Sequence, residues 1–126
     1  DYYAFPEPEA LALCTPESLG DLRAGFRARY LIDAAQKVAS SAVDLQALQV
    51  LPLEEARAHL RQIIGVGPKV AECTLLYGCG RMECFPVDVW IARAMERLFP
   101  HGLPEWAAPW AGIAQQYIFH YIRHEK

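Results

Sequence analysis

The chain has 126 residues, of which 53% are apolar and 21% charged, and its formal net charge is −3. These values indicate one globular domain with a buried core and exclude a disordered, fibrous or coiled-coil protein. No apolar run approaches the about 20 residues that a membrane-spanning helix needs. The net charge argues weakly against a nonspecific nucleic-acid binder, but residues 1–22 hold five of the 15 acids and no base, which leaves 10 acids against 12 bases in the remainder.

Apolar residues recur at helical spacing along nearly the whole chain, and no stretch alternates as a strand would. The expected helices, in chain order, are 7–13, 16–25, 28–40, 45–51, 53–64, 68–77, 89–99 and 109–123. Thr15, Asp44 and Asp88 stand where the N-caps of three of these helices are expected. The prediction is an all-α fold, a compact bundle of short helices with tight connections.

The four cysteines show no pattern typical of a metal site. Cys14, Cys73, Cys79 and Cys84 include no CxxC pair, and their spacing fits no common zinc motif. We therefore expect reduced thiols that are buried or half-buried, and no metal held by side chains.

The segment from Leu60 to Ala71 indicates a helix-hairpin-helix motif, over about 53–77, in which Gly65-Val66-Gly67 joins two helices. The two glycines allow positive φ and close approach of another backbone, and Val66 can place its side chain in the core. The N–H groups that begin the second helix can bind an anion. Such a turn can hold a DNA phosphodiester through main-chain donors without much positive charge. The alternative is a glycine-rich turn that serves packing alone.

Lys69 occupies the first turn of that second helix, where the helix dipole disfavours a cation by ~0.3–1 kcal/mol. A neutral lysine amine can attack carbon and form a Schiff base, which would explain the position. The alternative is a surface lysine that contacts a phosphate, and this too would indicate nucleic acid. Asp88, 19 residues further on, is by itself an N-cap worth ~1 kcal/mol.

The hairpin, Lys69 and the segment Phe85-Pro86-Val87-Asp88-Val89 together resemble the helix-hairpin-helix base-excision DNA glycosylases, and within them the 8-oxoguanine DNA glycosylases. The similarity runs from Tyr2-Tyr3-Ala4-Phe5-Pro6 through 25–30 to 110–115. The resemblance implies a bifunctional enzyme for base excision repair. Such an enzyme removes 8-oxoguanine opposite cytosine by attack of the lysine on C1′, and then cleaves the strand by β-elimination through a Schiff base.

The resemblance also assigns catalytic and base-binding roles to individual residues. Lys69 is the nucleophile, and Asp88 stabilises positive charge at C1′ or positions the amine. Phe119 stacks on the flipped purine, Gln115 hydrogen-bonds its Watson–Crick edge, and Cys73 packs against its other face. Each of the last three has an ordinary alternative as a core or rim residue.

Further residues are assigned to DNA binding. Phe26 corresponds to an aromatic wedge and Arg27 to a contact with the orphaned cytosine, whereas the alternative is a capping turn with Phe26 in the core. The hairpin binds the DNA backbone through Gly65, Val66 and Gly67. The family also holds an ion, here assigned to the carbonyls of Arg61, Ile63 and Val66. Trp90 replaces a phosphate-contacting histidine of eukaryotic relatives, and an indole lacks the charge for that role.

The implied partner is double-stranded DNA containing 8-oxoguanine paired with cytosine. The resemblance further implies a monomer that needs no cofactor, binds no membrane and is located with the genomic DNA of the cell. The family has an additional sheet-containing domain before the region matched here. We therefore expect residues 1–126 to be the helical domain of a longer protein. Two alternatives remain, a helix-hairpin-helix DNA-binding module without catalysis and a glycosylase for another damaged base.

Overall fold

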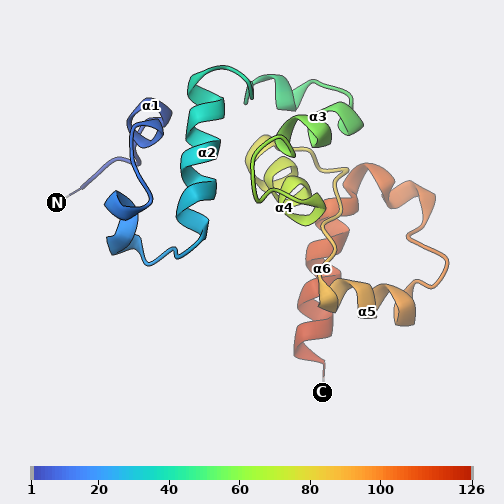
Figure 1. Ribbon diagram of the computed structural model, residues 1–126. Coiled ribbons are helices and arrows are strands. Elements are labelled where there is room, and N and C mark those ends of the chain that lie inside the picture. Colours follow the sequence, from blue (N-terminus) through green and yellow to red (C-terminus); the bar gives the residue numbers. More distant parts are fainter. Residues whose placement is uncertain (1, 126) are drawn as a thin grey trace. The chain divides into compact units, whose positions relative to one another are not determined.

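The computed structural model describes residues 2–125, which contain helices and turns but no strand (Figure 1). The prediction of an all-α fold is therefore confirmed. The chain divides into two compact units, one through Val66 and one from Gly67 onward. None of the helices in the described range is long and apolar enough to cross a bilayer.

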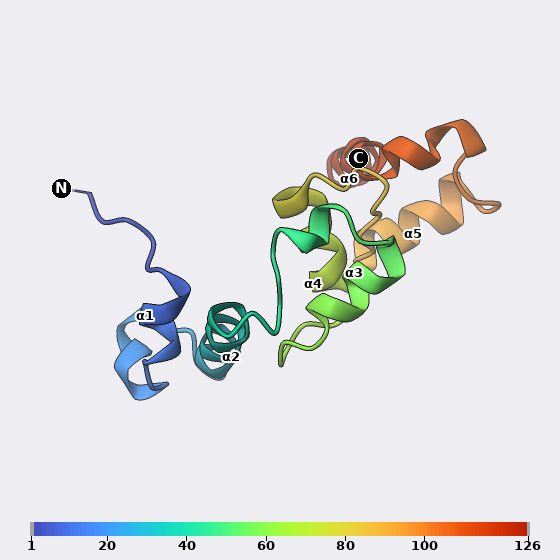
Figure 2. The same ribbon diagram turned by 90° about the horizontal axis from the view of Figure 1, so that it is seen from above.

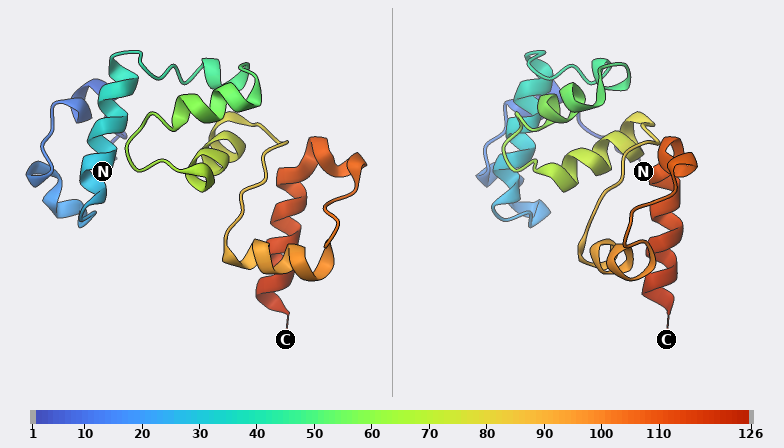
Figure 3. Two further views of the ribbon diagram at one scale, coloured as in Figure 1. Left: turned by 45° about the vertical axis from the view of Figure 1, so that its right-hand side comes forward. Right: turned by 90° about the vertical axis from the view of Figure 1, so that its right-hand side faces the viewer.

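The first unit is built around its longest helix. Its elements are α1 (Pro8–Ala12), the 3₁₀ turn η1 (Glu17–Leu22), α2 (Arg27–Ala39), the 3₁₀ turn η2 (Ala47–Gln49) and α3 (Leu53–Leu60). Helix α1 packs beside α2, as Figures 1 and 3 both show. Helix α2 buries Ala28, Ile32 and Ala35, whose spacing places them on one face.

Two residues expected as N-caps in this unit accept backbone hydrogen bonds just before a turn begins, although the N-caps of those turns are Pro16 and Gln46. The Ser18 N–H donates to Thr15 Oγ1 at 3.2 Å, while the Thr15 N–H donates to Ser18 Oγ at 3.0 Å. Asp44 Oδ1 accepts from the N–H groups of Gln46 and Ala47. Both segments are shorter than expected, since they are 3₁₀ turns rather than α-helices.

Helix α3 also ends earlier than the expected 53–64. The Ile63 N–H bonds to the Leu60 carbonyl, three residues back, which tightens the last turn. The next N–H, that of Ile64, donates to the Asp33 carboxylate of α2 instead of to a helical carbonyl. The chain thus leaves α3 through a tightened turn, and a side chain 31 residues away holds the N–H group that follows this turn.

The second unit contains α4 (Pro68–Cys73), the π-helical turn η3 (Thr74–Gly78), α5 (Val89–Leu98), the 3₁₀ turn η4 (Glu105–Trp110) and α6 (Ala111–His124). Helix α5 crosses α6, which is clear in Figures 1 and 3. Ile91 and Ala94 of α5 and Ile118 of α6 form the buried centre of this crossing. Partly buried apolar side chains, including Phe85, surround that centre.

The start of α6 is held against the loop that follows η3 (Figure 2). Gly112 is buried, and its N–H donates to the Met82 carbonyl at 2.8 Å. A Cβ at Gly112 would overlap the Leu76 side chain and would lie 2.8 Å from the Cys84 carbonyl oxygen. Only glycine fits here, and the close approach fixes α6 relative to the loop 80–88 that leads to Asp88.

Candidate functional site

Five of the residues singled out from the sequence line one cavity of about 200 Å³ in the second unit. They are the candidate catalytic residues Lys69 and Asp88 and the candidate base-binding residues Cys73, Gln115 and Phe119. Tyr77, Pro86 and Gln116 complete the lining. Residues up to 50 positions apart in the sequence thus line the same cavity.

Lys69 lies in the first turn of α4, and its side chain is exposed to solvent. Cys73 and Tyr77 follow at intervals of four residues and line the same cavity, the first at the end of α4 and the second in the π turn η3. Burial raises the pKa of the Tyr77 hydroxyl above its ordinary value, and the neighbouring Cys73 adds to that rise against an opposing hydrogen bond from Gln116. Tyr77 therefore stays neutral and can both donate and accept a hydrogen bond.

Asp88 is the N-cap of α5, as the sequence predicts. Its Oδ1 accepts a hydrogen bond from the Ile91 N–H at 2.8 Å, and the Asp88 side chain is half-buried. The positive end of the helix dipole favours a carboxylate at this position. The same cap fixes the rotation of the side chain at the edge of the cavity.

Gln115 is the buried polar residue of this site, with 6% of its surface exposed. Its Nε2 donates to the Pro86 carbonyl at 3.1 Å, and its Oε1 accepts from Nε2 of Gln116 at 2.6 Å. Gln116 also hydrogen-bonds the Tyr77 hydroxyl. The Gln115 amide is therefore held in one orientation by a chain of polar contacts that spans the cavity wall.

A cation lies against the aromatic side of the site. The Arg123 guanidinium carbon is 5.6 Å from the ring centre of Phe119 and 5.0 Å from that of Trp90. A second hollow of about 340 Å³ adjoins the first and shares Gln116 and Phe119 with it, while Arg123, His120 and His124 form its other side. Trp90 packs against the Arg123 side chain. The positive charge beside position 90 therefore comes from an α6 residue and not from the residue at position 90 itself.

Sequence reasoning did not single out Tyr77, Gln116 or Arg123. Tyr77 lies eight residues after Lys69, at the edge of the same helix stripe, and no chemical pattern marked it there. On α6, Gln116 is adjacent to Gln115, and Arg123 lies one turn after Phe119. This proximity is the only feature of the sequence that points to either residue. Their contacts join α6 to η3 and α5, which no local pattern reveals.

The hairpin turn belongs mostly to the first unit. Gly65 has φ +87°, and a Cβ there would lie 2.5 Å from the Tyr30 ring, so Gly65 needs both its freedom and its small size. Gly67 has φ −98°, which any residue can adopt, so only one of the two glycines uses positive φ. Val66 is half-buried rather than fully in the core. The Ile63 carbonyl, one of the three assigned to an ion, accepts from the Val66 N–H at 3.1 Å.

Phe26 immediately precedes α2 and is 60% exposed, which excludes the alternative that it is a core residue. The Arg27 guanidinium lies 5.0 Å from the centre of its ring. Tyr30, one turn further along α2, meets the same ring edge-on at 5.8 Å. An exposed aromatic supported in this way can enter a base stack.

The four cysteines are reduced thiols, with Cys84 buried and the others half-buried, as expected. Burial raises the pKa of the Cys79 thiol above its usual value, although Arg81 opposes the rise. Between residues 2 and 125, the structure places no three His, Cys, Asp or Glu side chains where they could share a metal ion.

Comparison with known proteins places these features in a family. A model of the HhH-GPD superfamily of base excision DNA repair proteins matches residues 1–104. The probable N-glycosylase/DNA lyase of Methanothermobacter thermautotrophicus is 31% identical, over 97% of this chain and 48% of the relative.

Two solved structures have the same fold. One is MBOgg1 in complex with a low-affinity DNA ligand, at 43% identity with a TM-score of 0.86. The other is the Clostridium acetobutylicum 8-oxoguanine glycosylase/lyase in complex with double-stranded DNA containing cytosine opposite 8-oxoguanine, at 32% identity with a TM-score of 0.81. In both cases 97% of this chain matches 46% of the other.

The all-helical fold is that of these two solved structures, and the family model covers most of the chain. The chain belongs to the HhH-GPD superfamily of base excision DNA repair proteins. It spans about half the length of the relatives it matches.

Proposed function

We propose that the chain is the catalytic helical part of a bifunctional 8-oxoguanine DNA glycosylase/lyase. The observation that carries the proposal is the single cavity lined by Lys69, Asp88, Cys73, Gln115 and Phe119. This set combines an amine and a carboxylate with an amide, an aromatic ring and a small apolar thiol. These groups suit the cleavage of a glycosidic bond and the binding of a flipped purine.

Lys69 supplies the nucleophile. Its neutral Nζ attacks C1′ of the damaged nucleotide, and the bond between C1′ and the base breaks so that the base leaves with the bonding electrons. Loss of a proton from Nζ and opening of the sugar ring at O4′ then give a Schiff base at C1′. Removal of a proton from C2′ expels the 3′ phosphate, which cleaves the strand, and water releases the lysine.

Asp88 stabilises the positive charge that develops at C1′ as the base departs. It lies at the positive end of the α5 dipole, and the bond from the Ile91 N–H fixes its direction. Capping and catalysis are compatible because the cap uses Oδ1.

The base is recognised on the wall formed by α4 and α6. Phe119 stacks on the purine, and Cys73 packs against its other face. The Gln115 amide hydrogen-bonds the Watson–Crick edge by exchanging its contact with Gln116 for one with the base. Without a base in the cavity, Gln116 occupies the hydrogen-bonding position on the Gln115 amide that the base would take.

The partner in this proposal is genomic duplex DNA with 8-oxoguanine opposite cytosine, bound by a monomer. The turn Gly65–Gly67 contacts the DNA backbone through main-chain N–H groups, and an ion at the carbonyls of Arg61, Ile63 and Val66 joins it to a phosphate. Phe26 enters the base stack and Arg27 contacts the unpaired cytosine. The chemistry needs no cofactor.

Borohydride trapping tests the nucleophile. The substrates are a duplex with 8-oxoguanine opposite cytosine and a duplex with an abasic site, each incubated with the wild type, Lys69→Gln or Lys126→Gln. The last variant removes the same charge at the final residue. We expect a covalent adduct with the wild type and with Lys126→Gln and none with Lys69→Gln, which should still bind DNA.

Other results would favour the alternatives. Adduct formation by Lys69→Gln would make the nucleophile assignment wrong. Binding of DNA without any adduct from a folded wild-type chain would favour a DNA-binding module. Adduct on the abasic duplex but not on the 8-oxoguanine duplex would point to intact lyase chemistry with a different base specificity.

A further inference from the structure

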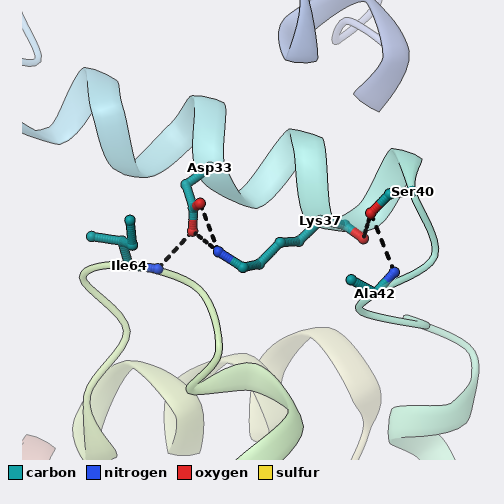
Figure 4. Close-up of polar contacts among 5 residues, drawn as sticks. All are labelled: Asp33, Lys37, Ser40, Ala42 and Ile64. Atoms are coloured by element: carbon teal, nitrogen blue, oxygen red, sulfur yellow. Dashed lines mark hydrogen bonds and ion pairs between the residues drawn. The ribbon is translucent and has the colours of Figure 1, made fainter.

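The hairpin turn is held by a carboxylate from a distant helix. Asp33 Oδ2, on α2, accepts a hydrogen bond from the Ile64 N–H at 2.7 Å (Figure 4). In Figure 4 the Asp33 side chain points from α2 to the backbone of the turn. This contact takes Ile64 out of the helical hydrogen-bonding pattern of α3 and begins the turn that contains Gly65.

The Asp33 carboxylate is charged and largely removed from water. Lys37 Nζ lies 2.6 Å from both of its oxygens, and the Asp33 side chain is 16% exposed. Burial tends to raise the pKa of this carboxyl, but the hydrogen bonds from Lys37 and from the Ile64 N–H outweigh it and lower the pKa below its ordinary value. A hydrogen bond to such an ionised acceptor is about twice as strong as a neutral one.

The bond fixes more than one N–H group because a peptide unit is planar. The Ile64 N–H and the Ile63 carbonyl belong to the same trans peptide, so they point in opposite directions. Asp33 therefore directs the Ile63 carbonyl away from α2, and that carbonyl accepts the Val66 N–H at 3.1 Å. One carboxylate thus sets the orientation of the peptide that closes the turn.

A second side chain of α2 holds the next residue of the turn. Tyr30 lies three positions before Asp33, on the same side of the helix, and its ring occupies the space that a Gly65 side chain would need. The same ring meets Phe26 edge-on. Helix α2 therefore carries both of the groups that hold the turn, and the candidate wedge Phe26 immediately precedes it.

From these contacts we infer that Asp33 is a positioning residue for DNA binding: it holds the peptide of Ile63 and Ile64 so that the Gly65–Gly67 turn has its DNA-binding shape before DNA arrives. The inference rests on the proposed function, because it takes the turn as a contact to the DNA backbone. The inference assigns Asp33 no contact with DNA, because its negative charge would oppose a phosphate. Its loss should nevertheless weaken binding, because a turn that must be ordered on binding costs affinity.

The experiment measures equilibrium binding of the 126-residue chain to a duplex with a tetrahydrofuran abasic analogue, which is not cleaved, over a range of KCl concentrations. The variants are Asp33→Ala, Asp33→Asn and Asp33→Glu. Asparagine keeps an acceptor for the Ile64 N–H, whereas glutamate keeps the charge but displaces the acceptor by one methylene. Glu54→Ala is the matched control, because it also removes a carboxylate and breaks an ion pair, with Arg57, on the surface of α3.

We expect Asp33→Ala to weaken binding about tenfold and to flatten its dependence on salt, because fewer phosphate contacts form. Asp33→Asn should remain within about threefold of the wild type, and Glu54→Ala should not weaken binding. The rate of strand cleavage at saturating abasic DNA should be unchanged in Asp33→Ala, so that the loss is in affinity alone. If Asp33 only stabilised the fold, Asp33→Ala would contain less folded protein that borohydride can trap on DNA. The folded fraction would still bind DNA with the salt dependence of the wild type.

Three results would overturn the inference while leaving the proposed function intact. They are wild-type affinity in folded Asp33→Ala, an equal loss in Glu54→Ala, and a loss in Asp33→Asn as large as that in Asp33→Ala. If Asp33→Ala fails to fold, Asp33→Glu decides, because it should weaken binding although its charge is kept. A wild-type chain that binds no duplex at all would instead overturn the proposed function, and this inference with it.

Discussion

The Arg123 guanidinium lies over the indole ring of Trp90, 5.0 Å from its centre, and so brings positive charge to a position where the side chain itself has none. Trp90 is two residues after Asp88, at the start of α5, whereas Arg123 is in the last turns of α6. The pair therefore ties the end of one helix to the beginning of the other beside the candidate catalytic cavity.

We predict that Arg123 contacts a DNA phosphate from this position. Replacement by methionine should weaken binding to an abasic-analogue duplex by about three- to tenfold and reduce the slope of log affinity against log salt by about one. Lysine at this position should restore part of the affinity, since it keeps the charge but stacks less well on a ring. Titrations at several salt concentrations measure both effects, and an unchanged slope in Arg123→Met would exclude the phosphate contact.

Asp88→Asn should separate catalysis from capping. Asparagine is as good an N-cap as aspartate, so the free energy of unfolding should stay nearly constant, whereas Asp88→Ala should lose ~1 kcal/mol. Both variants lose the carboxylate charge that stabilises the cation at C1′, so the single-turnover rate of base release should fall about 100-fold or more. Chemical denaturation and quenched-flow assays give the two quantities. A wild-type rate in Asp88→Asn would mean that Asp88 is only a cap.

Gln115 should matter for excision of the base and little for cleavage of an abasic strand. Gln115→Leu fills a similar volume but removes the amide that hydrogen-bonds the Pro86 carbonyl. We expect 8-oxoguanine release to slow at least tenfold, because the lost contacts are to the base, which an abasic site lacks. Parallel assays on the two duplexes test this difference. Equal slowing on both substrates would show instead that Gln115 supports the catalytic residues.

Gly65 and Gly67 should respond differently to alanine. At Gly65 a Cβ meets both a positive φ and the Tyr30 ring, so Gly65→Ala should lower the free energy of unfolding by about 2 kcal/mol or more. At Gly67 the backbone has an ordinary negative φ, and Gly67→Ala should change stability by less than about 1 kcal/mol. Urea denaturation of both variants decides the matter, and equal losses would contradict the assignment of the turn conformation.

Asp33 should contribute to stability only above acidic pH. Its pKa is lowered in the folded chain, so the folded state binds its proton less readily than the unfolded state does. The stabilisation is then fully present above the unfolded value of about 3.9 and is lost as the pH falls through the lower folded value. The difference in unfolding free energy between the wild type and Asp33→Asn should therefore shrink below about pH 4. A difference that stays constant down to pH 2 would contradict this linkage.

The sequence was informative where the interaction is local. Asp88 is the predicted N-cap of α5, and Thr15 and Asp44 each accept the predicted kind of hydrogen bond just before a 3₁₀ turn, because such an acceptor and its N–H partner lie within three residues of each other. The predicted end of α3 lies four residues beyond the observed one, because the chain tightens into i→i−3 bonds at Gln62 and Ile63 and the Ile64 N–H then bonds to Asp33 of another helix. The contact of Arg123 with Trp90 joins residues 33 positions apart, and no periodic pattern reports it.

The residues of the candidate cavity were found through family resemblance more than through pattern. Lys69 was the exception, because a cation in the first turn of a helix is unfavourable and so called for an explanation. Gln115 and Phe119 share a helix face, which periodicity predicts, but periodicity alone would equally have placed both in an ordinary core. The hydrogen bonds of Gln115 to Pro86 and Gln116 depend on the loop after η3, whose path the sequence does not specify.

The π turn at Thr74–Gly78 makes the number of residues in this segment matter as much as their identity. Such a turn closes with i→i+5 bonds and so holds one residue more than an α-helical turn. In an uninterrupted α-helix, Tyr77 would lie about 80° around the axis from Lys69. The extra residue brings Lys69, Cys73 and Tyr77 to one cavity. Deleting a single residue here would leave the composition of α4 and η3 almost unchanged, yet it would rotate a different side chain into the place that Tyr77 occupies.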